Sequence, residues 1–330
     1  MAELTYLEAG REALAQTMRA DPAVWALGED LGRGGVFGQY RGLAEEFGPE
    51  RIADTPISEA CIMGAAVGAA MMGTRPVVEM RFSDFALCAV DELVNQAAKA
   101  RFMFGGQTRV PLVARQPIGM WRSSAAQHSQ SLESWYTHIP GLVVITPATP
   151  ADNFSLLIAA IRCDDPVVYM EHKDLWPLTG AVDVDGHDDF DPVEEIGKAR
   201  IVREGSDVTV VTWSAMVHEA MKAADQVKAD GPAVEVIDLR TLWPWDQETV
   251  LASVRKTGRL LVVHESVQVG GFGAEIAATV AERAFADLKA PVRRLGAPRI
   301  LIGYAPTLEN EVKITAKRDI LPALHALMES

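Results

Sequence analysis

The chain has 330 residues, 48% of them hydrophobic and 23% charged, which is typical of a globular protein long enough for two domains with sizeable cores. Its formal net charge of −14 argues against a nucleic-acid-binding surface, because phosphate contacts need a basic patch. The first residues do not read as a secretory signal, no apolar run reaches the roughly 18 residues that span a bilayer, and three cysteines lie without metal-ligand spacing, so we expect a cytoplasmic protein without membrane contact.

Helix and strand patterns alternate along the first half of the chain. We expect helices over residues 6–19, 63–70, 86–102 and 151–162, and strands over residues 24–28, 75–80, 110–115, 142–146 and 167–170. Because these strands are continuously apolar and lie between helices, they indicate a parallel sheet that is covered on both faces.

The composition changes at residues 183–195, which hold seven acidic residues and no helical or alternating apolar period. We interpret this stretch as a connection between domains, and its carboxylates lack the spacing of a calcium loop. Strands at 207–212, 233–238 and 260–264 follow, with helices at 215–228 and from about residue 270. The prediction is two doubly wound α/β domains, residues 1–182 and 205–330, joined by an acidic linker at 183–204.

Glu59 is the only ionisable residue near the start of a helix made almost entirely of small residues. Pro56 fixes its own φ and keeps Thr55 extended, so the chain enters this turn extended. The simplest interpretation is a carboxylate that lies favourably at a helix N-terminus, a contribution of about 0.3–1 kcal/mol. Three apolar neighbours are expected to withdraw it from water: Ile57, Ile62 and Met63.

Two turns are rich in glycine, at residues 28–35 and 270–273, but neither has the spacing of a phosphate-binding fingerprint. Acidic residues also occupy the first turn, where an anion would bind. We therefore interpret both as tight turns between strand and helix and disfavour a Rossmann dehydrogenase. No Gly-Asp-Gly sequence occurs anywhere in the chain.

Three stretches carry a resemblance to a known family: DTPISEACIMGAAVGAAMMGTRPVVE at 54–79, AAQHSQSLESWYTHIPGL at 125–142 and DDPVVYMEHK at 164–173. They resemble the beta subunit of thiamine-diphosphate-dependent 2-oxo acid dehydrogenases, a family that includes the pyruvate, branched-chain 2-oxo acid and acetoin enzymes. The resemblance extends over nearly the whole chain. It implies a pyrimidine-binding domain followed by a transketolase C-terminal-like domain.

The resemblance implies thiamine diphosphate as the cofactor and assigns roles to particular residues. The residue matching Glu59 contacts N1′ of the aminopyrimidine, where a carboxyl group favours the tautomer that takes the C2 proton. Ile57 and Phe85 match residues around the same ring, and Phe85 packs on it. Arg81 is also placed at the cofactor, but related chains often carry a neutral residue there, so its cation is interpreted as a partner for a substrate carboxylate or for the partner chain. His128 matches a histidine that acts as acid or base during acyl transfer to lipoamide, which suits imidazole because such groups titrate near neutral pH.

Each of these residues also has a simpler interpretation from the sequence alone. A histidine in a polar loop is more often structural or solvated than catalytic, and Phe85 fits ordinary core packing. Residues 119–124 depart from the family, because they replace a loop that is richer in glycine in relatives.

The missing Gly-Asp-Gly motif implies a partner, because this family binds the diphosphate and Mg²⁺ through that motif. The resemblance implies that an alpha subunit carries the Gly-Asp-Gly motif. It also implies a heterotetramer of two alpha and two beta chains that passes acyl groups to a dihydrolipoyl acyltransferase core. A potassium ion is a further implication, held by main-chain oxygens of five residues: Leu112, Ala160, Ile161, Cys163 and Asp165. Cys163 weakens this implication, since an acidic or amide residue is frequent at its position.

The sequence is therefore interpreted as the beta subunit of an oxidoreductase that acts on the oxo group of donors with a disulfide, lipoamide, as acceptor. Two segments, residues 103–106 and 171–173, favour a pyruvate or acetoin substrate over a branched-chain one. Two alternatives stay open at this point. One is a transketolase-like carbon–carbon transferase, which the missing motif disfavours, and the other is a catalytically silent assembly subunit, which Glu59 and His128 disfavour.

Overall fold

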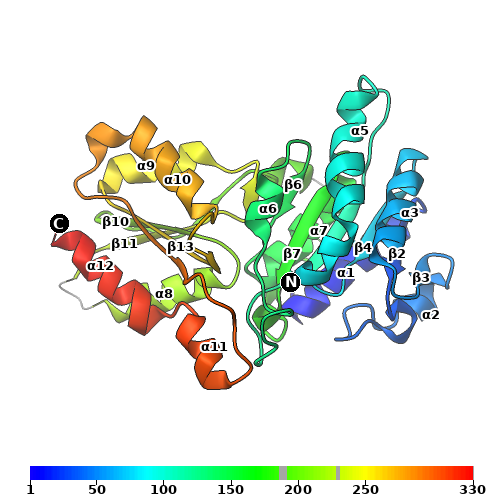
Figure 1. The fold of residues 1–330 in the computed structure, drawn as a ribbon, viewed down its shortest axis with the longest axis horizontal. Coiled ribbons are helices and arrows are strands. Elements are labelled where there is room, and N and C mark those ends of the chain that lie inside the picture. The colour runs from blue at the N-terminus through cyan, green and yellow to red at the C-terminus, as the bar shows by residue number, and fades with distance from the viewer. Residues whose placement is uncertain (186–191, 228–230, 330) are drawn as a thin grey trace. The chain divides into compact units, whose positions relative to one another are not determined.

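The computed structural model describes residues 1–185, 192–227 and 231–329 (Figure 1). These residues form two compact units. The first unit contains residues 1–118 and 135–196, and the second contains residues 119–134 and 197–330. Part of the acidic linker prediction, residues 186–191, lies outside the described residues. The division by packing falls inside the predicted linker, but it also assigns residues 119–134 to the second unit, although the sequence analysis placed them in the first domain.

The first unit is an α/β layer built on a parallel sheet. Its strands are β1 Ala2–Thr5, β2 Val24–Gly28, β3 Ile52–Asp54, β4 Arg75–Glu79, β5 Val113–Ile118, β6 Val143–Ile145, β7 Val167–His172 and β8 Thr179–Val182. Its helices are α1 Tyr6–Ala20, α2 Leu43–Phe47, α3 Glu59–Met71, α4 Ser83–Ala86, α5 Ala98–Met103 and α7 Pro150–Arg162. The short helix α6, Glu133–Thr137, lies where the chain passes between the units.

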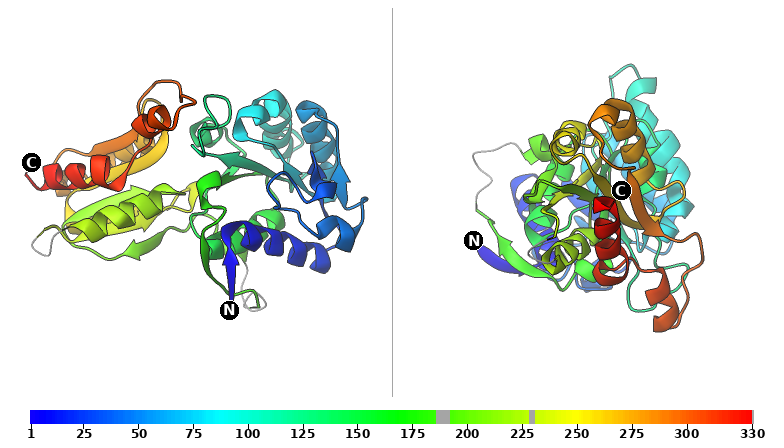
Figure 2. Two further views of the ribbon diagram at one scale, coloured as in Figure 1. Left: turned by 90° about the horizontal axis from the view of Figure 1, so that it is seen from below. Right: turned by 90° about the vertical axis from the view of Figure 1, so that its left-hand side faces the viewer.

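Strand pairing puts the carboxyl ends of the central strands at one edge of the first sheet. The order is β6-β7-β5-β4-β2-β3, and every pair in it is parallel. Helices α1 and α7 pack together on one face, and α3 and α5 lie on the other (Figure 2, left). Helix α1 begins at a capping box in which Thr5 and Glu8 exchange hydrogen bonds, and Thr149 caps α7, so both helices begin within one residue of their predicted starts.

The second unit has a five-stranded sheet in the order β14-β13-β10-β11-β9, in which only β9 is antiparallel to its neighbour. The strands of that sheet are β9 Arg200–Arg203, β10 Val208–Thr212, β11 Val234–Asp238, β13 Leu260–Val267 and β14 Arg293–Ala297, and the short strand β12 Thr241–Trp243 is not part of it. Its helices are α8 Met216–Gln226, α9 Gln247–Thr257, α10 Gly273–Arg283, α11 Pro306–Val312 and α12 Leu321–Met328. Helices α8 and α12 cover one face of this sheet, and α9 and α10 cover the other (Figure 1).

The doubly wound α/β architecture is thus confirmed, and two elements differ from their predictions. The helix expected at 86–102 is present and extends from Ser83 to Met103, but its hydrogen-bond pattern changes along its length. It passes from α4 through a 3₁₀ turn at Leu87–Ala89 and a π-helical stretch at Glu92–Ala97 to α5. The strand expected at 110–115 lies instead at 113–118, and it includes the buried polar residues Arg115 and Gln116, which do not read as part of an apolar strand. None of the helices in the described residues combines the length and apolar character that a bilayer crossing requires.

Candidate functional site

Glu59 is the first residue of α3 and lies at the carboxyl edge of the sheet in the first unit. Strands β3, β2 and β4 end side by side there, and in open parallel sheets this edge is where ligands bind. Glu59 is partly buried. The backbone amide of Thr55 donates to the carbonyl of Gly28 at 3.0 Å, which fastens the extended entry to α3 against the end of β2.

Two acidic residues and a cation lie at the same edge as Glu59. Glu29 and Asp30 directly follow β2, and Arg81 lies two residues after β4. The guanidinium of Arg81 forms an ion pair with Asp30 and lies 3.8 Å from the Glu29 carboxylate. Burial raises the pKa of Glu29; the Arg81 charge lowers it, and the nearby carboxylate of Glu59 raises it further.

Glu29 and Asp30 were not predicted as part of this cluster. The available signal was an acidic pair immediately after a predicted strand. Their presence changes the interpretation of Arg81, because its charge is already met inside the chain.

Two aromatic side chains, Phe82 and Phe85, closely follow Arg81 in the chain. Phe85 is partly buried on α4, and its ring lies 6.0 Å from the ring of Phe82 between centroids. The Lys173 ammonium lies 4.6 Å from the centre of the Phe82 ring, a cation–π contact. Ile57, in contrast, is 78% exposed and gives Glu59 no apolar cover within this chain. The expected withdrawal of Glu59 from water by Ile57 is therefore wrong for the chain by itself, because a side chain this exposed shields nothing from solvent.

A buried polar network supports the cluster from inside the sheet. The Tyr40 hydroxyl donates to Glu79 at 2.8 Å, and Arg115 forms two hydrogen bonds to Glu171, at 2.8 and 2.9 Å. Burial raises the pKa of Glu79 to about 7, although the Arg115 charge opposes this. At Gly28 a Cβ atom would lie 2.7 Å from the Glu79 carbonyl oxygen, so glycine is required where β2 approaches β4 before Glu29.

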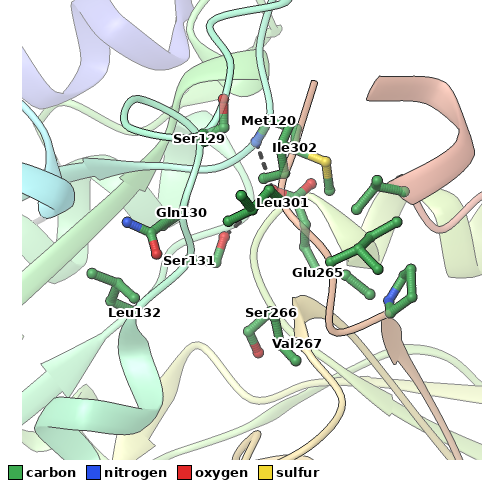
Figure 3. Close-up of a pocket in the computed structure, with 15 residues that line it drawn as sticks. Met120, Ser129, Gln130, Ser131, Leu132, Glu265, Ser266, Val267, Leu301 and Ile302 are labelled. Carbon is green, nitrogen blue, oxygen red and sulfur yellow. Dashed lines mark hydrogen bonds between the residues drawn. The ribbon is translucent and has the colours of Figure 1, made fainter. Parts of the chain in front are cut away.

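His128 lies in the second unit, in a loop at residues 119–131 that we call the His128 loop. The residue is partly buried, and its backbone amide donates to the Ala125 carbonyl at 3.4 Å. The loop borders a cavity of about 90 Å³ that is lined by loop residues, by the end of β13 and by the segment at residues 297–302 (Figure 3). At one wall, Glu265 of β13 accepts hydrogen bonds from the Met120 amide at 2.7 Å and from the Ser131 hydroxyl at 3.4 Å (Figure 3).

The end of this segment is attached to a buried aromatic cluster. The Trp213 indole donates to Glu133 at 3.1 Å, and the Phe272 amide donates to Ser134 at 3.0 Å. Trp213 stacks on His264 with ring centroids 5.3 Å apart. Burial raises the pKa of Glu133 and lowers that of His264 to about 4, so His264 is neutral at pH 7.

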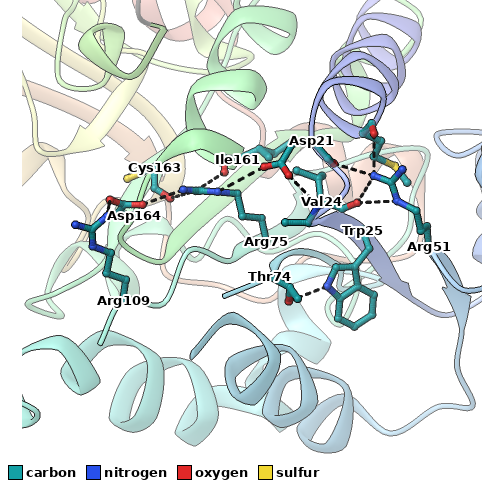
Figure 4. Close-up of polar contacts among 12 residues, drawn as sticks. Asp21, Val24, Trp25, Arg51, Thr74, Arg75, Arg109, Ile161, Cys163 and Asp164 are labelled. Carbon is teal, nitrogen blue, oxygen red and sulfur yellow. Dashed lines mark hydrogen bonds and ion pairs between the residues drawn. The ribbon is translucent and has the colours of Figure 1, made fainter. Parts of the chain in front are cut away.

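The residues implied as potassium ligands lie around the end of α7, and a guanidinium occupies part of that position. Arg75 donates to the carbonyls of Ile161 and Cys163 at 3.0 and 3.1 Å and to the Asp164 carboxylate at 3.0 Å (Figure 4). The Leu112 carbonyl accepts from the Val167 amide at 2.9 Å. Asp165 pairs with Arg101 at 2.6 Å, and Ala160 lies within α7.

The donor set fits one half of a thiamine diphosphate site. A partly buried carboxylate at this edge of the sheet suits an aminopyrimidine, which needs a proton-sharing partner. Across residues 1–185, 192–227 and 231–329, no three His, Cys, Asp or Glu side chains are grouped to hold a metal ion.

Comparison with known proteins agrees with this geometry. Residues 2–179 match the model of the transketolase pyrimidine-binding domain, and residues 197–318 match that of the transketolase C-terminal domain. The chain is 43% identical over 313 residues to the 2-oxoisovalerate dehydrogenase subunit beta of Bacillus subtilis, covering 94% of each chain. It is 44% identical over 310 residues to the acetoin:2,6-dichlorophenolindophenol oxidoreductase subunit beta of Cupriavidus necator, covering 91% of this chain and 90% of the other. It is 44% identical over 311 residues to the pyruvate dehydrogenase E1 subunit beta of Rhizobium meliloti, covering 94% of this chain and 67% of the other.

Solved structures support the same fold. A split-gene transketolase chain, described as an inactive beta4 tetramer, superposes with a TM-score of 0.80 at 24% identity and covers 99% of this chain and 98% of that chain. Transketolase of Pichia stipitis superposes with a TM-score of 0.73 at 13% identity, covering 100% of this chain and 46% of its own length.

Proposed function

This chain belongs to the family of beta subunits of the 2-oxo acid and acetoin dehydrogenases, and we propose that it supplies the pyrimidine-binding half of a thiamine diphosphate site in such an enzyme. The observation that carries the proposal is Glu59, a partly buried carboxylate that begins α3 at the carboxyl edge of a parallel sheet. Bound thiamine diphosphate supplies the electron sink for cleaving the bond next to the substrate's carbonyl group.

In this proposal the residues of the chain divide between holding and proton transfer. Glu59 holds a proton at the pyrimidine nitrogen, and the ring of Phe85 packs on the pyrimidine face. Glu59 lies close enough to Glu29 to raise the pKa of Glu29. Arg81 pairs with Asp30 and lies near Glu29, so its single positive charge offsets one of these two carboxylates. His128 exchanges a proton with the acceptor during acyl transfer to lipoamide.

The proposal includes a partner chain. No Gly-Asp-Gly motif is present in the sequence, so the diphosphate and Mg²⁺ are assigned to an alpha subunit, in a heterotetramer of two alpha and two beta chains that serves a dihydrolipoyl acyltransferase core. The exposed Ile57 supports this assignment, because an apolar side chain next to a catalytic carboxylate needs a cover that the chain itself does not provide. The three cysteines are unpaired, which suits a reducing cytoplasm.

The substrate is proposed as pyruvate or acetoin, with a branched-chain 2-oxo acid as the alternative. The identities of 43% and 44% to relatives named for all three substrates do not choose among them. A panel of 2-oxo acids and acetoin, tested with an artificial electron acceptor and the assembled enzyme, separates the candidates by kcat/KM.

Calorimetry tests the need for a partner. The purified chain is expected to bind thiamine diphosphate with Mg²⁺ negligibly, and to gain binding when an alpha subunit with the Gly-Asp-Gly motif is added. Micromolar binding by the chain alone would show that it holds a complete site, and the two-chain proposal would then be abandoned.

A further inference from the structure

The His128 loop has an unfavourable backbone conformation that needs external support. Arg122, Ser123 and Ala125 have φ values of 49°, 57° and 63°, in the left-handed region that residues other than glycine rarely adopt. Three such residues within four positions store strain, and strain of this kind persists only where surrounding contacts fix the conformation.

Glu265 closes the two ends of the loop. One carboxylate oxygen accepts both the Met120 amide, at 2.7 Å, and the Ser131 hydroxyl, at 3.4 Å, although the two residues are eleven positions apart in the sequence. The Gly119 amide also donates to the Gln130 carbonyl at 3.4 Å, so the ends are joined both directly and through Glu265. Glu265 is only 9% exposed, and a hydrogen bond to a charged, shielded acceptor is stronger than one between neutral groups.

Glu309, on α11, holds the strained part of the loop. Its carboxylate accepts the amide of Ser123 at 2.8 Å, and its other oxygen pairs with Lys313 at 3.0 Å. Glu309 is 4% exposed. Because Lys313 fixes the orientation of this carboxylate, its oxygen stays directed at the Ser123 amide, which lies between the left-handed residues Arg122 and Ala125.

We propose that Glu265 and Glu309 are positioning residues, which fix the His128 loop through its main-chain amides and thereby hold His128 in the position needed for proton exchange. They act through main-chain amides and not on the substrate or cofactor. This inference rests on the proposed function, in which His128 exchanges a proton during acyl transfer.

Hydrogen exchange tests the positioning directly and without activity. In the assembled enzyme, Glu265→Ala is expected to raise the exchange rate of the Met120 amide, and Glu309→Ala that of the Ser123 amide, each about tenfold or more. Glu265→Gln and Glu309→Gln keep a neutral acceptor and should restore most of the protection. Glu311→Ala, an exposed position on the same helix as Glu309, is the matched control and should leave both amides unchanged. Unchanged exchange in both alanine variants would overturn the proposal.

A split between two assays then connects the loop to catalysis. Both alanine variants are expected to lower acyl transfer to lipoamide about 10- to 100-fold, while reduction of 2,6-dichlorophenolindophenol and exchange of the cofactor's C2 proton stay near wild type. If both assays fall together, the carboxylates support the fold in general and the positioning role is wrong. Should Glu265→Ala fail to assemble, Ser131→Ala and the Glu309 variants carry the same comparison. His128→Ala separates the role of His128 from the role of the two carboxylates. Unchanged acyl transfer in that variant would remove the proposed role of His128, whereas the hydrogen-exchange result would still decide whether Glu265 and Glu309 hold the loop.

Discussion

Acidification should destabilise the second unit through His264. His264 is on β13, and its fully buried ring packs against three glycines. Cβ atoms added at Gly271, Gly273 or Gly296 would come within 2.6 to 2.8 Å of the ring. The Nδ1 atom of His264 is hydrogen-bonded to the Ser266 carbonyl at 3.0 Å, and Nε2 has no hydrogen-bond partner among the described residues. A protonated ring would bury an unpaired N–H and a charge, which is why its pKa falls from 6.5 to about 4.

The sign and size of the effect follow from this shift. Because the folded-state pKa of His264 is the lower one, the unfolded chain takes up a proton first, and stability is lost as the pH falls from about 6.5 to about 4. The full loss is about 3 kcal/mol, of which about 2 kcal/mol falls between pH 7 and pH 5.

Hydrogen exchange of the β13 amides, measured at pH 7 and pH 5 and corrected for intrinsic rates, reports the opening free energy. His264→Asn keeps a donor for Ser266 and removes the titration, so the stability difference between wild type and variant should shrink by about 2 kcal/mol on going to pH 5. The exposed His325 supplies the control, and His325→Asn should leave the pH dependence as it is. A difference between wild type and His264→Asn that stays constant between the two pH values would refute this account of the buried imidazole.

Three further predictions follow from the first unit. Glu59→Gln in the assembled enzyme should lower kcat and C2 proton exchange together by about 10²- to 10⁴-fold, and wild-type exchange would reduce Glu59 to a helix-terminal carboxylate. The stability of Glu79→Gln relative to wild type, measured by denaturant titration, should increase by about 2 to 3 kcal/mol when the pH is raised from 5 to 8. The reason is that the raised pKa of about 7 makes ionisation of Glu79 costly in the folded wild type. A stability difference that is independent of pH would contradict this. Replacing potassium by N-methylglucamine should leave the melting temperature of the enzyme unchanged, because Arg75 already supplies a cation to the carbonyls of Ile161 and Cys163; a drop in the melting temperature would show that an ion binds as well.

Local patterns predicted the parts of the structure that local physics decides. Helix α7 could be read from the sequence because a capping threonine precedes a run with helical apolar spacing. The short edge strands β1 and β8 could not, because their antiparallel pairing joins residues that are far apart in the sequence and half exposed. The same limit applies to the site. Glu59 has a distinctive local setting, whereas Glu29 belongs to the site only because β2 and β3 pair.

The His128 loop shows the limit most clearly. Its polar residues suggested a functional loop, yet the sequence assigned it to the first domain, since it lies between two of that domain's strands. Its attachment to Glu265 and Glu309 spans separations of 145 and 186 residues, and no local pattern reports contacts of that range.

Those separations also set an order of events during synthesis. Met120 leaves the ribosome 145 residues before its acceptor Glu265, and Ser123 leaves 186 residues before Glu309. At a translation rate of about 5–20 residues per second, the loop waits on the order of 10 s for either carboxylate. During that interval three left-handed residues have nothing to hold them, so the loop can reach its final form only after β13 and α11 have been made. The histidine-bearing loop therefore matures late, although its sequence is complete before half of the chain has been translated.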